Sequence, residues 1–474
     1  MHYTRSLRVP VPAATLFAWH ERPGAFERLS PPWQRVRVVR ADGSLRDGAR
    51  VELDAPLAPL AALDPLVDRL LPRRWVAEHR DYRPGEQFRD VQIEGPFARW
   101  SHLHRVAPDG PDASVLTDAI DLALPFGPLG ALGTPVARAE LDRLFTYRHA
   151  VTAADLARHA PHAARAPLTV AITGASGLVG AALGAFLTTG GHTVVRIGRG
   201  APAPAAPQRR DVRWDPEAGV LDPAALDGVD AVVHLAGASV ADRWTPAHKR
   251  AIEDSRVRGT TLVARTLAAL AREGRGPRTL VSASAIGIYG DRGDEPRDET
   301  SAPGTGFLAD VARRWEGATA PAEEAGLRVV HARIGVVLSA KGGALPRLML
   351  PFQLGAGGKV GSGRQWMSLV ALDDVVGALH HLLMHDGRRG AVNVVGPAPV
   401  TNAEFARVLG HVLGRPSFAA APAFAIRLML GREQADEMVL ASQRVLPRAL
   451  LADGFAFRHP TLEDALRFEL GRAA

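Results

Sequence analysis

Hydrophobic and polar positions from residue 168 onward alternate between two patterns. Short, almost wholly apolar stretches predict buried strands over 168–173, 192–197, 229–235, 278–283 and 328–334. Longer stretches with apolar residues three and four positions apart predict helices over 178–189, 246–273 and 308–325. Strands that alternate with helices predict a parallel sheet with helices on both faces, a doubly wound α/β fold.

The first 150 residues follow a different pattern. Apolar periodicity predicts helices over 12–20 and 135–147. Stretches in which polar and apolar residues alternate predict strands over 34–39, 49–53, 75–80, 87–93, 100–106 and 114–122. This order predicts an α+β domain in which an antiparallel sheet wraps around one helix.

Composition divides the chain into parts. Residues 153–167 are rich in Ala, Pro and His and predict a linker between a first domain, residues 1–152, and a second, residues 168–400. Past residue 400 the pattern becomes helical, and Thr401 to Glu404 has the form of a capping box, which Thr461 to Asp464 resembles. We therefore expect a small helical C-terminal region, residues 401–474.

Charge and cysteine content exclude several classes of protein. The 474 residues include no cysteine, so thiol nucleophiles, disulfides and Cys-based zinc sites are excluded. The net charge of +7 comes almost entirely from arginines that alternate with carboxylates, so no nucleic-acid partner is expected. The N-terminus has no apolar signal core, and glycines interrupt the apolar stretch 168–187. We expect a cytoplasmic protein without a membrane partner.

A buried strand leads directly into a series of spaced glycines. Gly174 permits a tight turn, Gly177 lets the backbone approach a pyrophosphate, and Gly180 lets the next helix pack closely on the strand. The N–H groups at the start of that helix then face the phosphates. The turn predicts a dinucleotide site made by Gly174, Ser176, Gly177, Leu178, Val179 and Gly180.

The end of the next strand indicates which dinucleotide binds. It contains Arg196 and Arg199 but no carboxylate that could bind the ribose 2′-hydroxyl of NAD. Arginine suits a 2′-phosphate, so we predict NADP(H) rather than NAD, with Arg199 the better candidate because it stands at the strand's exit. The following strands end in small residues that leave space for the cofactor ribose, and they add Leu235, Ala236, Gly237 and Ser282 to the predicted cofactor site. His234 is expected to be a packed strand residue.

These motifs together resemble a known superfamily. Residues 168 to about 400 resemble the extended short-chain dehydrogenase/reductase (SDR) and sugar-epimerase group, with its Rossmann fold, at residues 173–180, 234–237, 282–290 and 369–376. The chain resembles more closely an atypical, epimerase-like branch of this group. That branch is of unknown function and has an extra C-terminal domain. The matching pieces of that branch are 315–316, 333–338, 342–346, 361–366, 444–447 and 454–455.

The first 150 residues resemble the helix-grip family (START/polyketide-cyclase-like), through residues 31–33, 95–97 and 100–104. That resemblance implies an apolar cavity and a hydrophobic ligand. His102 and His104 lie two positions apart on a predicted strand and therefore share a face. Because spacing identifies no third ligand, we expect a packed or hydrogen-bonded pair and no metal site.

The superfamily resemblance implies a catalytic tyrosine with a lysine four residues later, and this chain lacks both. Those positions hold Leu308 and Ala312. The superfamily's serine position falls on Ala285, beside Ser284, and Tyr289 is the only tyrosine of this domain. Ser284 and Tyr289 are therefore the candidate catalytic residues.

Asp291 and Arg333 are further candidates, because they lie at or just beyond strand ends. Arg333 is either a member of a buried ion pair or an anchor for an anion, whereas Asp373 and Asp374 are expected to cap a helix.

Three functions remain open. The protein could be an oxidoreductase or epimerase-like enzyme that acts on a small molecule through other groups. It could bind NADP(H) without turnover, as a sensor or scaffold. It could also be a fusion in which the N-terminal pocket feeds the second site. The sequence does not predict the oligomeric state.

Overall fold

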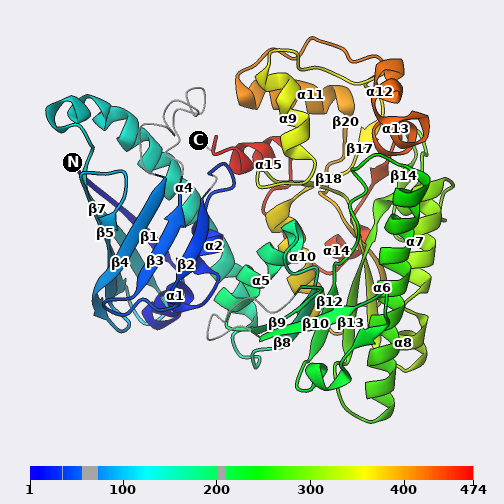
Figure 1. The fold of residues 1–474 in the computed structure, drawn as a ribbon, viewed down its shortest axis with the longest axis horizontal. Helices are drawn as coiled ribbons and strands as arrows, with labels where there is room; N and C mark the ends of the chain where they lie inside the picture. Colours follow the sequence, from blue (N-terminus) through cyan, green and yellow to red (C-terminus); the bar gives the residue numbers. More distant parts are fainter. Residues whose placement is uncertain (35, 56–72, 201–209, 473–474) are drawn as a thin grey trace.

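The computed structural model describes residues 1–34, 36–55, 73–200 and 210–472. Residue 35, inside the strand predicted over 34–39, lies outside the described residues. Figure 1 shows an N-terminal domain on one side, the parallel-sheet domain on the other, and C-terminal helices that return over the second domain toward the first.

An antiparallel sheet builds the N-terminal domain. Seven strands of the described residues pair in the order β1-β7-β6-β5-β4-β3-β2. They are β1 (His2–Val9), β2 (Arg37–Ala41), β3 (Arg50–Asp54), β4 (Arg74–Arg83), β5 (Gln87–Glu94), β6 (Arg99–Pro108) and β7 (Ser114–Ala123). Helix α4 (Thr134–His159) packs on this sheet, and its Leu141 and Phe145 share a core with Tyr3, Ile120 and Leu122. The predicted helix-wrapped antiparallel sheet is confirmed.

Helix α4 is longer than the sequence pattern predicts. It continues to His159, so the first half of the predicted linker, residues 153–159, is helical. Alanine has the highest intrinsic helix propensity, and the alanines of this stretch extend the helix. The N-terminal domain therefore reaches the second domain through a helix rather than through an irregular connection.

A parallel sheet forms the second domain. Within the described ranges its strand order is β11-β10-β9-β8-β12-β13-β15-β19, and all neighbours are parallel except β11 with β10. The strands are β8 (Thr169–Thr173), β9 (Thr193–Gly198), β10 (Arg210–Asp215), β11 (Val220–Leu221), β12 (Ala231–His234), β13 (Thr279–Ala285), β15 (Arg328–Ile334) and β19 (Gly390–Val394).

Helices cover both faces of this sheet. On one face, α5 (Leu178–Thr189) and α10 (Leu372–Met384) bury a core around Ile172, and on the other α6 (Pro246–Arg272) and α8 (Ala320–Glu324) bury a core around Val232. The doubly wound fold is confirmed. From β8 the chain continues to β9 on one side and later to β12 on the other, which makes the end of β8 a topological switch point, where such folds bind ligands.

Some elements differ from the sequence prediction. The helix predicted over 308–325 is two helices, α7 (Phe307–Gly317) and α8. Pro321 lies in the first turn of α8, where its missing N–H costs no hydrogen bond. Strands β1, β10 and β19 were not predicted, because their charged residues or short length hide the alternation that identifies a strand.

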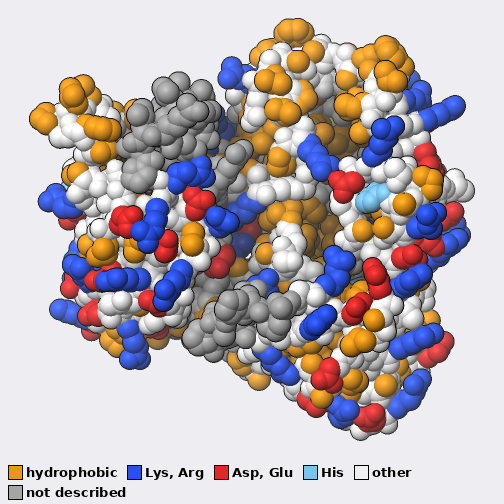
Figure 2. Space-filling model, viewed as in Figure 1, with side chains coloured by type: hydrophobic (Ala, Val, Ile, Leu, Met, Phe, Trp, Pro, Cys, Tyr) orange, Lys and Arg blue, Asp and Glu red, His pale blue; other side chains and the backbone are white. Residues whose placement is uncertain are grey.

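The C-terminal region is helical, as expected. It contains α11 (Asn402–Leu413), α12 (Ala423–Leu430), α13 (Arg432–Met438), α14 (Arg448–Ala452) and α15 (Leu462–Glu469). Both predicted capping positions are confirmed, because the Thr401 side chain accepts from the Glu404 amide at 3.3 Å and the Thr461 side chain from the Asp464 amide at 3.2 Å. Figure 2 shows hydrophobic side chains gathered over this end of the molecule, near α12. No helix of the described residues is long and apolar enough to cross a membrane.

A buried arginine joins the two domains. Arg28 of α2 (Ala25–Leu29) donates to both oxygens of Asp155 in α4, at 2.8 and 2.7 Å, and to Asp373 of α10 at 2.8 Å. Asp373 and Asp374 stand in the first turn of α10, but that helix has no side-chain cap. The predicted capping role is therefore wrong: Asp373 pairs with Arg28 and Arg458, and Asp374 accepts from the amides of Arg458 and His459.

Candidate functional site

The glycine turn after β8 admits no side chain at two of its positions. Gly174 has φ +67°, in the left-handed region that favours glycine, and a Cβ there would lie 2.9 Å from the carbonyl carbon of Leu235. A Cβ on Gly180 would lie 2.3 Å from the carbonyl oxygen of Gly174. The close strand–turn–helix packing that the sequence predicts therefore depends on both glycines.

The first amide groups of α5 have no side-chain cap and can bind an anion. Its N-cap residue is Gly177, which has no side chain to cap the first amides, those of Leu178 and Val179 among them. Ser176 and Gly177 are exposed. A Cβ at Gly177 would approach only the Gly174 carbonyl oxygen, at 3.2 Å, so the space above the turn is open. This geometry fits a pyrophosphate, because helix N-termini attract negative charge.

Thr173 ties the end of β12 to the glycine turn. Its Oγ1 accepts from the amides of Leu235 at 3.0 Å and Ala236 at 3.3 Å. The same hydroxyl lies 2.7 Å from Nδ1 of His234, which is fully buried and whose pKa burial lowers to about 4. The segment from Leu235 to Gly237 thus lies beside the turn, and His234 is a neutral packed residue.

The two arginines of the cofactor prediction occupy different positions. Arg196, on β9, donates to the carbonyl of Ala175 at 3.2 Å, which brings its guanidinium to the glycine turn. Arg199 follows the end of β9 and is exposed. The structure therefore brings Arg196 to the glycine turn, whereas Arg199 is exposed beyond the end of β9.

Ser284 and Tyr289 belong to one buried network. Ser284 donates to Glu316 Oε1 at 2.6 Å, and Arg333 donates to both Glu316 oxygens at 2.8 Å. Arg333 also donates to the Tyr289 hydroxyl at 2.9 Å, and that hydroxyl donates to Asn393 Oδ1 at 2.8 Å. Of the two alternatives for Arg333, the ion pair is therefore the observed one.

This network keeps the candidate catalytic hydroxyls inside the protein. Tyr289 is fully buried, and burial raises its pKa. Ser284 is 3% exposed, and Ser282, on the same strand, is also buried and donates to the Ala283 carbonyl at 3.3 Å. A general acid or base must reach the substrate's proton, directly or through one water. In this structure the Ser284 hydroxyl donates to Glu316 and the Tyr289 hydroxyl to Asn393.

The C-terminal region contacts the start of the helix on which the missing dyad would lie. Leu308 and Ala312 lie on α7, where the superfamily's tyrosine and lysine would be. The Glu437 carboxylate, from α13, accepts from the amides of Phe307 at 2.9 Å and Leu308 at 2.8 Å, so it caps α7. Sequence spacing could not find this contact, because about 130 residues separate its partners.

Arg256 is a charged residue of this region that the sequence analysis missed. It lies on α6, donates to the Ala238 carbonyl at 3.0 Å, and has its Cζ 4.9 Å from the centre of the Trp315 ring. A Cβ on Gly237 would lie 3.2 Å from that Cζ. Burial lowers the pKa of Arg256 to about 10, and its hydrogen bonds within the described chain go to the backbone carbonyls of Ala238 and Ile252. It places a positive charge beside the predicted cofactor edge.

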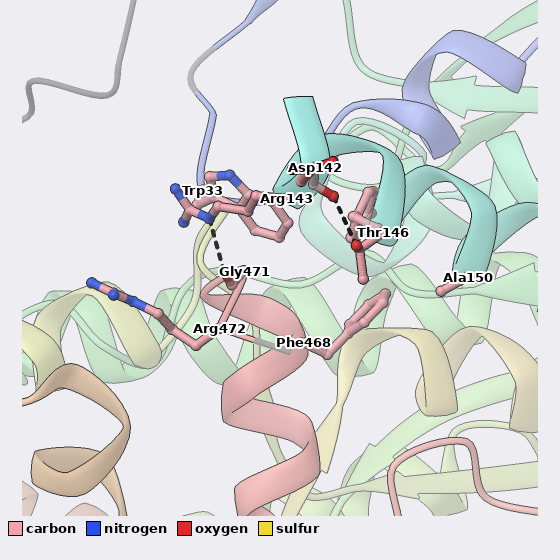
Figure 3. Close-up of a pocket in the computed structure, with 9 residues that line it drawn as sticks. Trp33, Asp142, Arg143, Thr146, Ala150, Phe468, Gly471 and Arg472 are labelled. Atoms are coloured by element: carbon pink, nitrogen blue, oxygen red, sulfur yellow. Dashed lines mark hydrogen bonds between the residues drawn. The ribbon is translucent and has the colours of Figure 1, made fainter. Parts of the chain in front are cut away.

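A separate cavity lies between the first domain and the C-terminus. Its volume is about 440 Å³, and Figure 3 shows it between α4 and the end of α15. Arg143 spans this junction by donating to the carbonyls of Leu470 at 2.7 Å and Gly471 at 2.8 Å. No residue of the predicted cofactor site lines this cavity. The lining residues are Trp33, Asp142, Arg143, Thr146, Tyr147, Ala150, Phe468, Gly471 and Arg472.

Three family models match separate parts of the chain. Residues 170–396 match the NAD dependent epimerase/dehydratase family. Residues 9–146 match the polyketide cyclase / dehydrase and lipid transport family, and residues 421–469 match a domain of unknown function, DUF1731.

Relatives and solved structures agree with these matches. An epimerase family protein of Mycobacterium bovis is 45% identical over 304 residues, which cover 64% of this chain and 98% of that protein. A nucleoside-diphosphate sugar epimerase structure from Corynebacterium glutamicum, 34% identical, covers 99% of this chain and 90% of its own, with a TM-score of 0.79. The human epimerase family protein SDR39U1, solved with NADPH, is 31% identical, covers 65% of this chain and all of its own, and has a TM-score of 0.58. The chain therefore belongs to the epimerase family, in its atypical SDR branch with a DUF1731 C-terminus, and it has an N-terminal polyketide cyclase/dehydrase domain.

Proposed function

We propose that this protein binds NADP(H) at the turn from Gly174 to Gly180 and uses it as an oxidoreductase or epimerase-like enzyme on a small molecule. The observation that carries the proposal is the glycine turn itself, which lies at the switch point of the sheet. Its backbone is packed so closely at Gly174 and Gly180 that neither position has room for a side chain. The NADPH in the structure of the human relative supports the same cofactor.

The residues of this chain would hold the cofactor in three ways. The first amides of α5 bind the pyrophosphate, the segment from Leu235 to Gly237 borders the ribose, and Arg196 and Arg199 supply positive charge for the 2′-phosphate. The bound nicotinamide would supply hydride chemistry. Arg256 would orient an anionic group, of the cofactor or of the substrate, beside Gly237.

Titration with both dinucleotides tests the cofactor proposal. NADPH should bind more tightly than NADH, and Arg199→Ala should weaken NADPH binding about tenfold, or about 1.4 kcal/mol, with NADH binding unchanged. Equal affinity of Arg199→Ala and the parent protein for NADPH would remove Arg199 from the site. Preference for NADH in the parent protein would overturn the choice of cofactor.

A non-catalytic role, as an NADP(H)-dependent sensor or scaffold, is the second candidate. It is favoured by the absence of the Tyr/Lys dyad and by the burial of Ser284 and Tyr289. Stopped-flow measurement of NADPH oxidation against a panel of metabolites separates the two functions. Turnover of any metabolite supports the enzyme, whereas tight NADPH binding without turnover supports the sensor.

The substrate and the ligand of the first domain are small molecules in this proposal, the second of them hydrophobic. Mass spectrometry of small molecules that co-purify with the native protein is the direct way to identify them.

A further inference from the structure

Neighbouring strands of the N-terminal sheet bring histidines and aspartates together in the domain's interior. Asp90 of β5 is the register partner of His79 on β4 and of His102 on β6, and His104 on β6 is the partner of Asp118 on β7. All five point toward α4, where His149 contacts Asp118. Residues far apart in sequence thus form one cluster in what the family resemblance predicts to be an apolar interior.

Three of these residues have the geometry of metal ligands. Asp90, His102 and His104 can each place one donor atom within 4.8 Å of the donor atoms of the other two. His102 and His104 are buried, and the Asp90 side chain is 24% exposed. Asp90 is the third ligand that sequence spacing could not identify, because it lies on the adjacent strand.

Several donor atoms of the cluster pair with one another. His79 Nδ1 lies 2.6 Å from Asp90 Oδ1, His104 Nε2 lies 3.2 Å from Asp90 Oδ2, and His104 Nδ1 lies 2.8 Å from Asp118 Oδ1. An ion held by His104 Nε2 and Asp90 would take the place of the proton between these two side chains, while His104 Nδ1 keeps its contact with Asp118.

Asp118 has the position of an outer carboxylate. It accepts from His102 Nε2 at 3.0 Å and from His149 Nε2 at 2.8 Å. Metal-binding histidines usually donate their second ring N–H to such a carboxylate, which fixes the tautomer. The proton of His102 is then on Nε2, so the lone pair on Nδ1 is available to an ion.

We propose that Asp90, His102 and His104 bind a divalent first-row transition ion, such as Zn²⁺, inside the N-terminal domain, with His79 beside them and Asp118 as the outer carboxylate. Two imidazoles and a carboxylate, without thiolates, suit Zn²⁺ and its neighbours in the series. The ion would tie together the adjacent strands β5 and β6, and its open coordination positions would give the domain a Lewis acid.

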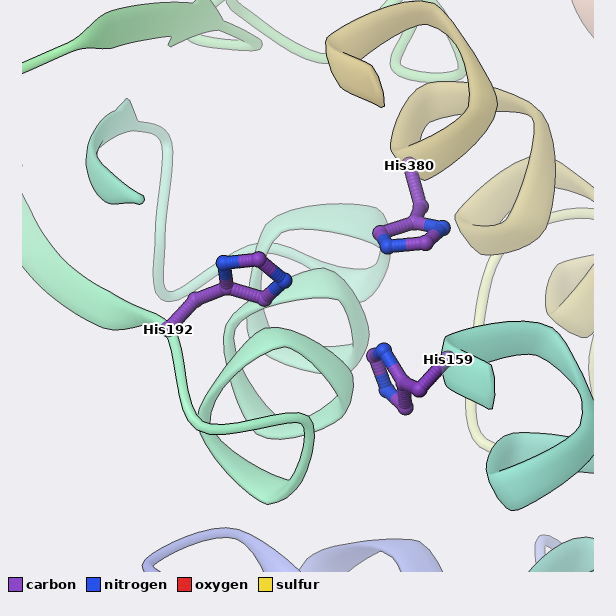
Figure 4. Close-up of side chains that lie close together, drawn as sticks. All are labelled: His159, His192 and His380. Atoms are coloured by element: carbon purple, nitrogen blue, oxygen red, sulfur yellow. The ribbon is translucent and has the colours of Figure 1, made fainter. Parts of the chain in front are cut away.

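A second histidine cluster serves as a control. His159, His192 and His380 also approach within 4.8 Å, at the junction of the two domains (Figure 4). In this cluster, hydrogen bonds to the backbone occupy ring nitrogens that a metal ion would need. His192 Nδ1 accepts from the Leu168 amide at 2.9 Å, so in the neutral ring its proton is on Nε2. His159 Nε2 contacts the Phe186 carbonyl at 3.2 Å, so that nitrogen is a donor.

Metal titration of the chelator-treated, full-length protein tests the proposal. Zn²⁺ alone, followed by calorimetry, should bind at one ion per chain, and Co²⁺ should give visible absorption bands. Asp90→Asn combined with His102→Gln should weaken Zn²⁺ binding at least 100-fold, whereas His192→Gln at the junction should leave it unchanged. Thermal denaturation of each variant, compared with the parent protein, reports whether the N-terminal domain is still folded.

X-ray absorption of the Zn²⁺-loaded parent protein needs no variant. It should show imidazole nitrogens and a carboxylate oxygen at about 2.0–2.2 Å. The proposal is overturned if the parent protein binds no stoichiometric ion, if its zinc spectrum lacks imidazole, or if His192→Gln abolishes binding and the Asp90/His102 variant does not.

Discussion

The carboxylate of Glu316 neutralises the guanidinium of Arg333 and joins it to the candidate catalytic residues. Arg333 donates to Glu316 and to the Tyr289 hydroxyl, and Ser284 donates to the same carboxylate. Both charges are largely buried, with side-chain exposures of 9% and 13%. Each charge therefore depends on the other, since a buried ion without its partner is strongly destabilising.

Replacing this carboxylate should unfold the protein more easily. Glu316→Ala leaves the Arg333 charge buried and unpaired, and should lower the free energy of unfolding by about 3–5 kcal/mol. Asp310→Ala, which removes the exposed pair with Arg313 on the same helix, should cost no more than about 1 kcal/mol. Urea denaturation of both variants measures the difference. Similar losses in the two would show that the network adds nothing beyond a surface pair.

Arg256 should matter for ligand binding. Arg256→Met keeps the side chain's apolar contact with Trp315 but removes the charge beside Gly237, so it should weaken NADPH binding about tenfold. Arg258→Met, at an exposed position of the same helix, is the matched control. Fluorescence titration with NADPH checks both variants. An unchanged dissociation constant for Arg256→Met would mean that its charge does not face the cofactor.

Among the secondary-structure elements, α5 begins at a position where little side-chain volume is tolerated. Gly180→Ala places a Cβ 2.3 Å from a backbone oxygen of the turn, which must then move, so NADPH affinity should fall at least tenfold. Gly184→Ala, one turn later, would approach only Val194 at 3.9 Å. It should preserve NADPH affinity and stabilise the helix by up to about 1 kcal/mol. Equal NADPH binding by the two variants would contradict the assigned role of Gly180.

Helix α15 should make stability depend on pH. Burial raises the pKa of Glu469 from 4.5 to about 7, so between these values the folded chain keeps a proton that the unfolded chain releases. The free energy of unfolding should therefore fall as pH rises through this range, by about 1.4 kcal/mol per pKa unit of the shift. Glu469→Gln should remove this part of the decrease in the free energy of unfolding with pH.

Urea denaturation between pH 4 and 8 checks the slope. Glu463→Gln, on the exposed side of the same helix, should keep the parent's pH profile. If Glu469→Gln declines as steeply as the parent protein, the carboxyl is ionised in the folded chain throughout.

Sequence patterns predicted the elements wherever apolar residues form a continuous stretch or recur with a single period. The buried strand β8, the glycine turn and α5 follow from local residues alone. Strand β10 could not be predicted, because its charged residues do not reveal that β9 pairs with it. The pairing of Arg333 with Glu316, the capping of α7 by Glu437 and the approach of Asp90 to His102 all need tertiary structure, since spacing along the chain carries no information on them.

For the whole molecule, the contact of Arg28 with Asp155 and Asp373 is a buried ionic link between the domains. Arg28→Ala leaves Asp155 buried without its cation and should cost about 3–5 kcal/mol. We expect calorimetry to show an earlier, separate transition of the N-terminal domain. Arg22→Ala, which removes a single bond to the Thr189 carbonyl in the same interface, should cost only about 1 kcal/mol. One unchanged transition in Arg28→Ala would show that the domains are held together by other contacts.

One tight approach between the domains is at Gly24. It has φ +95°, and a Cβ there would lie 2.6 Å from the Ala185 carbonyl oxygen on α5. Helix α5 thus has the phosphate turn at one end and the N-terminal domain against its side. A substitution at Gly24 or on this face of α5 therefore acts on both domains at once.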